Sequence, residues 1–161
     1  MRPVQGRIMA LDVGEKSLGV AISDSLGATA QPLVTLWRKG LAADLEAVLQ
    51  LVRSLGVEEV VVGLPTRTDG REGPEAERVR AFAGKLRSVV DVRVRLFDER
   101  FSTRQAERIL LEADLPRRRR RRAVNHVAAA IILDAYLTWR QVRRAQAEGT
   151  LHEAGDADGQ G

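Results

Sequence analysis

Residues 7–23 read RIMALDVGEKSLGVAIS, and this stretch decides how the rest of the chain is arranged. Two apolar runs lie on either side of a turn that contains Gly14, which predicts a strand, a tight turn and a second strand. Asp12 is the one carboxylate inside the first run, and a buried strand holds an unpaired carboxylate only at a high cost in free energy. Asp12 is therefore either a turn residue at the strand end or a ligand of a cation, and this stretch alone leaves both interpretations open.

Length and composition predict a single domain outside the membrane. At 161 residues the chain is long enough to bury its own core. It has no run near the ~18 apolar residues that a membrane helix needs, and residues 1–5 lack the apolar run of a signal peptide. It has no cysteine, which excludes disulfides and zinc–thiolate sites. We therefore expect a cytoplasmic protein with no membrane partner.

The basic residues are almost all arginines. The net charge is +4, and of the 26 lysines and arginines only Lys16, Lys39 and Lys85 are lysines. The planar guanidinium matches the geometry of a phosphate, and a basic protein with clustered arginines suits a polyanionic partner. A GC-rich genome would produce the same excess of arginine, so composition alone does not decide between the two explanations.

The remaining chain alternates between helical and extended patterns. We predict a third strand at 33–37, a helix at 41–55, a strand at 59–63, a helix from Pro74, a strand at 92–97, a helix from about 102 to 113 and a long helix at 123–145. Three closely spaced strands at the start predict an antiparallel meander, and the continuous apolar run at 59–63 suits a central strand. The fold class is therefore α/β, with a mixed five-stranded sheet of meander plus parallel strands, flanked by helices. We expect the domain to span 1–146 and residues 147–161 to form a disordered tail.

Acidic residues stand at the ends of two predicted strands. Asp12 lies at or near the end of the first strand, and Asp98 and Glu99 lie at the end of the last. If both strands are central, these carboxylates can approach each other, and they then need a cation between them. Oxygen ligands without cysteine select Mg²⁺ or Mn²⁺, and two such ions ~3.5–4 Å apart can hydrolyse a phosphodiester. The alternative is that Asp98-Glu99-Arg100 forms an ordinary surface ion pair.

The same residues resemble a known family. The chain is similar to the YqgF/RuvX family of RNase H-like proteins, whose members are described as pre-16S rRNA nucleases or Holliday junction resolvases. The match covers roughly residues 7–140 and rests on four stretches, LDVGEKSLGVA at 11–21, VVGLP at 61–65 with Asp69-Gly70, DERFST at 98–103 and AAAIIL at 128–133. The resemblance implies an RNase H-like fold and a metal-dependent phosphodiesterase site.

The resemblance also implies which residues form that site. The family's first acid falls on Asp12 and its second on Glu99, and each would bind Mg²⁺ or Mn²⁺, with Asp12 bridging the ions if two bind. The family's third acid falls on Asn125, which offers a carbonyl oxygen without charge, so metal affinity should be lower here. Asp134 lies nine residues further on and points to the opposite side of the helix. His126 is adjacent to Asn125 but rotated by about 100°, so we expect it not to be a ligand.

Basic residues flank these acids. Six consecutive arginines precede Asn125. They form either a solvated loop or a segment that binds phosphates beside the metal site. Their position directly before Asn125 favours phosphate binding. Lys16 and Arg100 could contact the scissile phosphate, or they could pair with Glu15 and Glu99. Asp98 should face away from Glu99 because a strand alternates its sides. The candidate nucleic-acid contacts are Lys16, Arg100, Arg117, Arg118, Arg119, Arg120, Arg121 and Arg122.

These features predict a nuclease that hydrolyses phosphodiester bonds with one or two Mg²⁺ or Mn²⁺ ions. By resemblance, the first candidate function is processing of the 5′ end of pre-16S rRNA. The second is cleavage of a Holliday junction in DNA recombination and repair, which a homodimer would favour over a monomer. The third is nucleic-acid binding with weak or lost catalysis, which Asn125 motivates. The expected partner is structured RNA or branched DNA.

Overall fold

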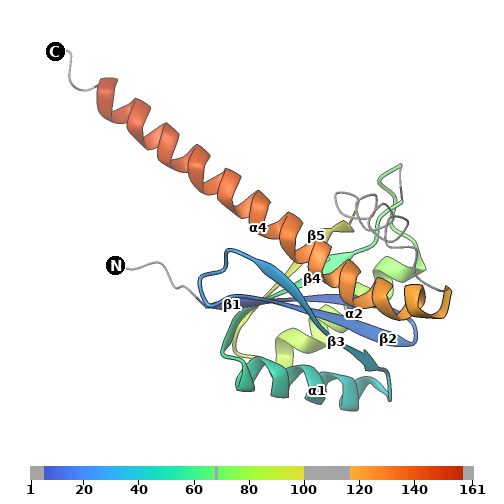
Figure 1. Ribbon diagram of the computed structural model, residues 1–161. Helices are drawn as coiled ribbons and strands as arrows, with labels where there is room; N and C mark the ends of the chain where they lie inside the picture. Colours follow the sequence, from blue (N-terminus) through green and yellow to red (C-terminus); the bar gives the residue numbers. More distant parts are fainter. Residues whose placement is uncertain (1–5, 68, 100–116, 158–161) are drawn as a thin grey trace.

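A five-stranded sheet carries helices on both faces (Figure 1). The computed structural model describes residues 6–67, 69–99 and 117–157, with side chains from 127 to 149 in the last range. The predicted helix at 102–113 lies outside the described residues. The elements are β1 (Arg7–Val13), β2 (Ser17–Ser23), β3 (Ala30–Trp37), α1 (Leu41–Ser54), β4 (Val57–Leu64), α2 (Pro74–Val89), β5 (Arg93–Asp98) and α4 (Arg117–Ala157).

The strand order in the sheet is β3-β2-β1-β4-β5. Strands β1, β2 and β3 pair antiparallel, whereas β4 pairs parallel with both β1 and β5. This confirms the predicted mixed sheet of a meander plus parallel strands. Because β1, β4 and β5 run in the same direction, their carboxyl ends lie at the same edge of the sheet, which is where the acidic residues are found.

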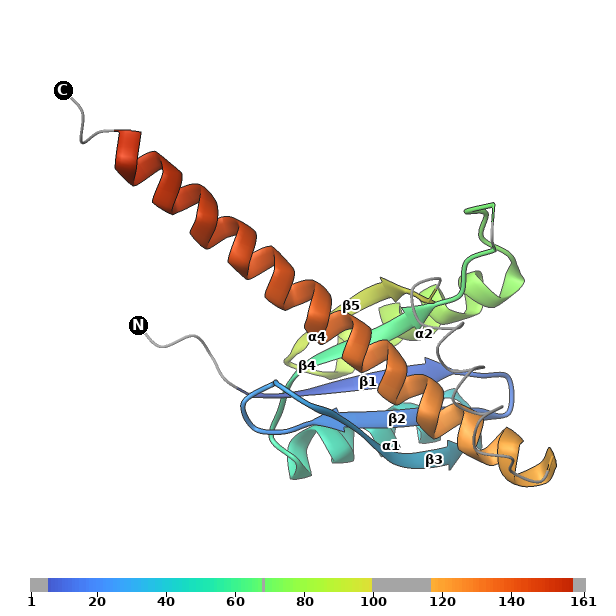
Figure 2. The ribbon, with the colours of Figure 1, turned by 45° about the horizontal axis from the view of Figure 1, so that its top comes forward.

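The two faces of the sheet follow the alternation of side chains along each strand. In β1, Met9 and Leu11 belong to a core cluster with residues of α1 and α2. Ile8 and Ala10 belong to a second cluster with residues of α4. Figure 2 shows α4 crossing one face of the sheet, with α1 and α2 on the opposite side. Asp12 continues the series of Ile8 and Ala10, so it lies on the face that α4 covers.

The face under α4 is lined by small side chains. Ala10 of β1 is paired with Ala21 of β2 and with Val61 of β4, and Ala129 of α4 packs against them in the same cluster. Short side chains let a helix axis approach a sheet closely, and all four residues are buried. The helix therefore lies directly above the strands that carry the candidate site.

Helix α4 is longer than the sequence pattern predicted. It begins at Arg117 rather than at residue 123, so the arginine run forms its first turns and is not a loop. It continues to Ala157 through the segment that we expected to be disordered from 147. Arginine is a good helix former, and the two glycines of α4, Gly149 and Gly155, cost only about 1 kcal/mol each. The domain boundary near residue 146 stays a prediction. In the described parts of the chain, no helix combines the length and the apolar character needed to cross a membrane.

Candidate nuclease site

Asp12 and Glu99 meet at the carboxyl edge of the sheet. Asp12 is the next-to-last residue of β1, and Glu99 follows directly after β5, with β4 between the two strands. Their carboxyl groups are hydrogen-bonded to each other. Asp12 is thus inside its strand and not in the turn, which removes the turn interpretation. The tertiary fold brings together the two acids that the strand ends predicted.

Both carboxyl groups hold their proton more strongly than a solvated acid does. Burial raises the pKa of Asp12, although its hydrogen bond with Glu99 opposes the shift. Burial and the neighbouring charge of Asp12 raise the pKa of Glu99 to about 8. Two touching carboxylates repel each other unless a proton or a cation lies between them. A divalent cation could therefore replace the shared proton, and the donor set of hard oxygens fits Mg²⁺ or Mn²⁺.

Gly63 of β4 makes room for this pair. A Cβ atom on Gly63 would lie 2.6 Å from Oε1 of Glu99 and 2.6 Å from Cδ1 of Ile132 in α4. The carboxylate and the helix therefore share the space directly above the Gly63 backbone. Any larger residue at this position would have to displace one of them.

The side chain of Asp98 is hydrogen-bonded to a residue outside the Asp12–Glu99 pair. The hydroxyl of Thr66, in the loop after β4, donates a hydrogen bond to Oδ1 of Asp98. This bond ties the end of β5 to the neighbouring loop and holds the backbone from which Glu99 projects. Within the described residues, no group of three Asp, Glu, His or Cys side chains is arranged to bind a metal, so the site offers two carboxylates.

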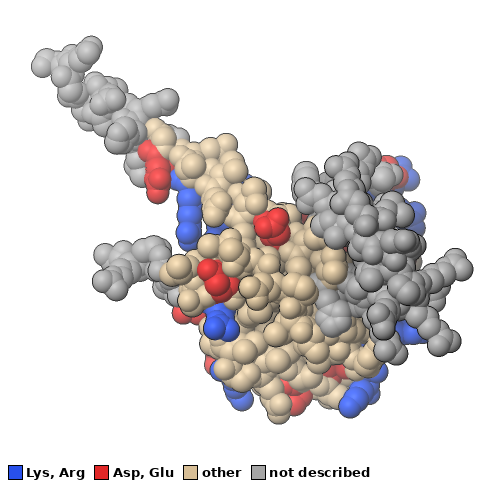
Figure 3. Space-filling view, viewed as in Figure 1, with Lys and Arg blue, Asp and Glu red and all other residues tan. Residues whose placement is uncertain are grey.

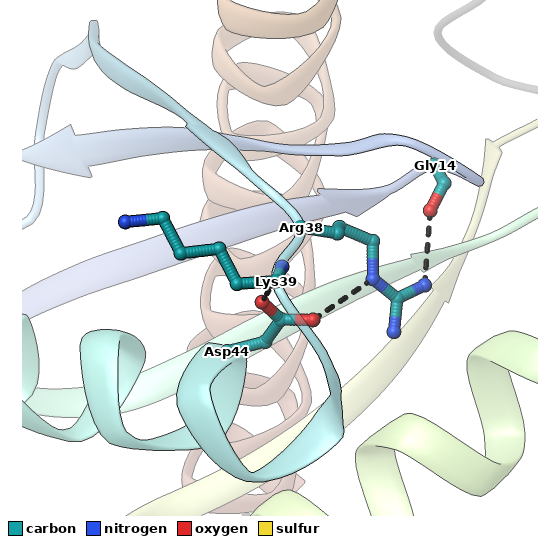
Figure 4. Close-up of polar contacts among 4 residues, drawn as sticks. All are labelled: Gly14, Arg38, Lys39 and Asp44. Atoms are coloured by element: carbon teal, nitrogen blue, oxygen red, sulfur yellow. Dashed lines mark hydrogen bonds and ion pairs between the residues drawn. The ribbon is translucent and has the colours of Figure 1, made fainter.

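Arg38 connects the turn after Asp12 to α1 through a hydrogen bond and an ion pair (Figure 4). Nη1 of Arg38 donates a hydrogen bond of 3.1 Å to the carbonyl of Gly14, and Nε lies 3.1 Å from Oδ2 of Asp44. Asp44 is only 5% exposed, and its Oδ1 accepts a hydrogen bond of 2.9 Å from the backbone N–H of Lys39. Gly14 itself donates to the carbonyl of Ser17 at 2.8 Å. The turn that follows the first acid is therefore rigidly placed.

The candidate phosphate contacts are only partly described. Lys16 is exposed on the turn between β1 and β2, while Glu15 lies 3.9 Å from Arg78 of α2. Arg100 lies outside the described residues. The arginine run from 117 to 122 lies in the first turns of α4, but its side chains are outside the description, so its contacts stay a prediction.

Asn125 can be placed only by its position along α4. It lies seven residues before Ile132, and two helical turns bring these residues to the same face of the helix, about 10 Å apart along the axis. Ile132 is buried beside Gly63. Asp134 is exposed, in keeping with its predicted orientation away from that face. The role of Asn125 as a third ligand remains a prediction.

Known proteins are similar to this chain in sequence and in fold. A family model described as "RuvX: Holliday junction resolvase" matches residues 6–139. The chain belongs to the RuvX family. A Moorella thermoacetica protein named "Putative pre-16S rRNA nuclease" is 59% identical over 131 residues, which cover 81% of this chain and 94% of that protein. This RuvX chain thus comes from a family named for nucleases and resolvases, enzymes that act on phosphodiester bonds.

Solved structures confirm the RNase H-like architecture of the RuvX chain. T. thermophilus RuvC in complex with a Holliday junction substrate matches with a TM-score of 0.57 at 15% identity, covering 84% of this chain and 96% of that one. The yeast mitochondrial Holliday junction resolvase Ydc2 matches with a TM-score of 0.53 at 9% identity, and the match covers 86% of this chain and 81% of that one. At these identities the likeness shows the fold.

The sequence alone did not identify two structural features of the RuvX site, the close approach to Gly63 and the contact between Asp44 and Arg38. Gly63 stands in an otherwise apolar strand, and an isolated glycine there signals a close approach of another group. Asp44 stands four residues before Val48 and eight before Val52, which are buried on the inner face of α1. An acid at that spacing requires a partner, and the sequence did not identify Arg38 as that partner.

Proposed function

We propose that this chain is a metal-dependent nuclease that processes the 5′ end of pre-16S rRNA. The observation that carries the proposal is the contact between Asp12 and Glu99, two partly buried carboxyl groups that are hydrogen-bonded to each other at one edge of the sheet and whose pKa values are both raised. Such a pair is costly to fold, so a catalytic use is the better explanation of it. The name shared by the relatives supports ribosomal RNA as the substrate.

Each residue has a defined task in this proposal. Asp12 and Glu99, once deprotonated, would hold Mg²⁺ or Mn²⁺, and Asn125 would add a neutral oxygen. A bound divalent ion supplies an activated water and stabilises charge on the leaving oxygen. Lys16, Arg100 and the arginines from 117 to 122 hold the phosphate backbone without reading its sequence. Arg38 positions the turn that carries Lys16.

Cleavage of branched DNA is the second candidate function. The description of the family model and the fold shared with RuvC and Ydc2 favour it. Symmetric cleavage of a four-way junction needs two active sites, so this function requires a homodimer. Binding without catalysis is the third candidate, because the neutral Asn125 weakens the proposed metal site.

A cleavage assay with three substrates tests the proposal. The protein is incubated with labelled RNA bearing the 5′ extension of 16S rRNA, with single-stranded DNA and with a four-way junction, in Mg²⁺, Mn²⁺ or EDTA. We expect cleavage of the RNA with either metal and none in EDTA. Asp12→Asn and Glu99→Gln should lower the rate by at least about 100-fold, the scale of loss when a group that stabilises developing charge is removed. Asn125→Asp should raise activity in Mg²⁺.

A matched variant controls for the change of charge. Asp91→Asn removes one exposed carboxylate between α2 and β5, and it should cut as wild type does. Binding without cleavage in either metal would refute the enzyme proposal, and preferential cleavage of the junction would replace the RNA substrate with DNA. If Asp12→Asn cut at the wild-type rate, the site assignment would be wrong. Lower activity of Asn125→Asp would show that the neutral amide has a role of its own.

A further inference from the structure

We propose that a groove at the end of the sheet opposite to Asp12 and Glu99 binds the phosphodiester backbone of the nucleic acid at a distance from the cleavage point. This inference rests on the proposed function and adds a second contact region to it. The groove lies between α4 and the first residues of β1, β4 and β5 and has a volume of about 590 Å³. We call it the arginine groove after the five arginines that line it, Arg93, Arg95, Arg140, Arg143 and Arg144.

The charges of the arginine groove favour an anion. Its lining has five arginines but only two acids, Glu58 and Glu59. Glu59 is already engaged, because Nε of Arg95 lies 3.3 Å from its Oε1 and the hydroxyl of Tyr136 donates a hydrogen bond to the same oxygen. Across the residues whose side chains are described, Arg93, Arg140 and Arg144 form no ion pair. Guanidinium groups that outnumber the acids around them are stabilised by bound phosphate.

Aromatic rings hold part of the groove in place. Trp139 stacks on Tyr136 with ring centroids 5.8 Å apart and an angle of 27° between the planes. The guanidinium of Arg143 lies 4.9 Å from the centre of the Trp139 ring, and Phe97 meets Tyr136 edge-on at 5.6 Å. A guanidinium that packs on a ring loses less freedom when it binds a phosphate. The groove is therefore partly ordered before any ligand arrives.

The groove is connected to the candidate active site along one face of β5. Arg93, Arg95 and Phe97 alternate onto the α4 side of this strand, and Glu99 continues the series. Four to six residues separate the two arginines from Glu99, which corresponds to about 13–20 Å at ~3.3 Å per residue. Strand β5 is the edge strand of the sheet, so no further strand of this sheet lies beyond it. A backbone leaving the active site along this edge would reach the groove after about six stacked nucleotides at ~3.4 Å each.

An extended backbone fits the groove better than an enclosed small molecule does. Arg93, Arg143 and Arg144 are exposed, so the positive charges face solvent and do not surround a closed cavity. Figure 3 shows Lys and Arg side chains in the angle between the projecting part of α4 and the body of the domain. Contacts of this kind add affinity and fix the register of the substrate, but they do not select a sequence.

Binding in EDTA tests the groove independently of cleavage. The double variant Arg93→Ala/Arg144→Ala removes two exposed charges from it, and Arg53→Ala/Lys85→Ala removes two exposed charges from α1 and α2 on the other face of the sheet. For RNA of about 30 nucleotides, we expect the groove variant to lose affinity on the order of tenfold, the scale of two lost exposed ion pairs. Its salt dependence should fall by roughly 0.7 in slope for each arginine removed. The control variant should bind as wild type does.

Steady-state cleavage adds a second readout. With a long substrate, the groove variant should show a raised KM and an unchanged kcat. With a substrate that ends about two nucleotides from the cut, too short to reach the groove when stacked at ~3.4 Å per nucleotide, it should match wild type. Circular dichroism checks that both double variants remain folded.

Several outcomes would overturn the proposal. Wild-type affinity of the groove variant, or an equal loss in both double variants, would show that the groove makes no specific contact. Competition of adenosine monophosphate or inorganic phosphate with long RNA, at concentrations that leave the groove variant unaffected, would assign the groove to a small phosphate ligand instead. If wild type cuts no RNA, the proposed function fails, and the binding comparison still decides whether the groove holds a nucleic acid.

Discussion

At the scale of single residues, Asp12 and Glu99 act as a pair. Their contact joins two partly buried carboxyl groups, so the pair keeps a proton at a pH where isolated acids are ionised. A divalent cation that binds between them must displace that proton. The protonation of the pair therefore couples metal binding, stability and activity.

Metal affinity should rise with pH. Because the pKa of Glu99 is raised to about 8, each bound ion displaces a proton below that pH, and affinity should increase about tenfold per pH unit up to about pH 8. Titration calorimetry with Mn²⁺ from pH 6 to pH 9 measures this. Glu99→Gln should bind more weakly and lose the pH dependence. A flat profile in the wild-type protein would contradict a protonated pair.

Stability should fall as pH rises when EDTA is present. Glu99 has a folded-state pKa of about 8, above the ordinary value of 4.5, so the folded state binds the proton more tightly than the unfolded state does. The stabilising contribution is complete below pH 4.5 and is lost as pH rises through 8. Thermal unfolding should therefore show a declining Tm over this window, and Asp12→Asn should flatten the decline. A Tm that does not change in wild type would argue against the shift.

Gly63→Ala should damage the site although it adds a single methyl group. The new Cβ would collide with Glu99 and with Ile132, and overpacking of this kind costs about 1–3 kcal/mol. Urea unfolding should show this loss, and cleavage should fall because Glu99 is displaced. Gly84→Ala is the matched control, since nothing lies within 4 Å of its Cβ position in α2. The control should be neutral or stabilising by about 0.5–1 kcal/mol. Equal behaviour of the two variants would refute the packing argument.

At the scale of elements, Arg38 couples the turn after β1 to the start of α1. It bonds the carbonyl of Gly14 and pairs with the buried Asp44, and its guanidinium also lies 5.7 Å from the centre of the Phe82 ring in α2. One side chain thus contacts the turn and both helices of that layer. The turn that follows Asp12 depends on this layer for its position.

Asp44→Ala should loosen that connection. The substitution leaves the backbone N–H of Lys39 and the guanidinium of Arg38 without their acceptor, and an unsatisfied buried group costs about 1–3 kcal/mol. Urea unfolding measures the loss, and a double-mutant cycle with Arg38→Ala isolates the pair. Glu72→Ala breaks the exposed pair with Arg80 and should change stability little. If both substitutions cost the same, burial would not be what gives the Arg38 contact its strength.

At the scale of the whole molecule, α4 has a part that packs on the sheet and a part that is exposed to solvent. Its middle part packs on β1, β2 and β3 and closes one face of the core, whereas residues 141–149 are exposed along their length. Figure 1 shows the carboxyl-terminal part of α4 projecting away from the sheet. The buried and exposed parts of this helix should therefore differ in their importance for folding.

Truncation after residue 146 should leave the domain intact. Residues 147–149, the part of this segment whose side chains are described, are exposed, so Tm should change by less than about 2 °C, which corresponds to about half a kcal/mol or less for a domain of this size. Differential scanning calorimetry of the shortened chain measures this, and truncation after residue 130, which removes the buried Ile132 and Tyr136, should prevent folding. A large loss of stability on removing 147–161 would place the domain boundary further along the chain.

The sequence by itself determined the order of the described strands and helices and the residue types available for chemistry, although it did not predict the full length of α4. Alternation along 7–23 and helical spacing are local signals, and so are the acids at the ends of β1 and β5. Tertiary structure decided which of these residues meet. The contact between Asp12 and Glu99, the close approach of Glu99 and Ile132 to Gly63, and the hydrogen bond of Arg38 to Gly14 all join segments far apart in the chain. They depend on strand order and on how closely a helix approaches a sheet, and no local pattern encodes those distances.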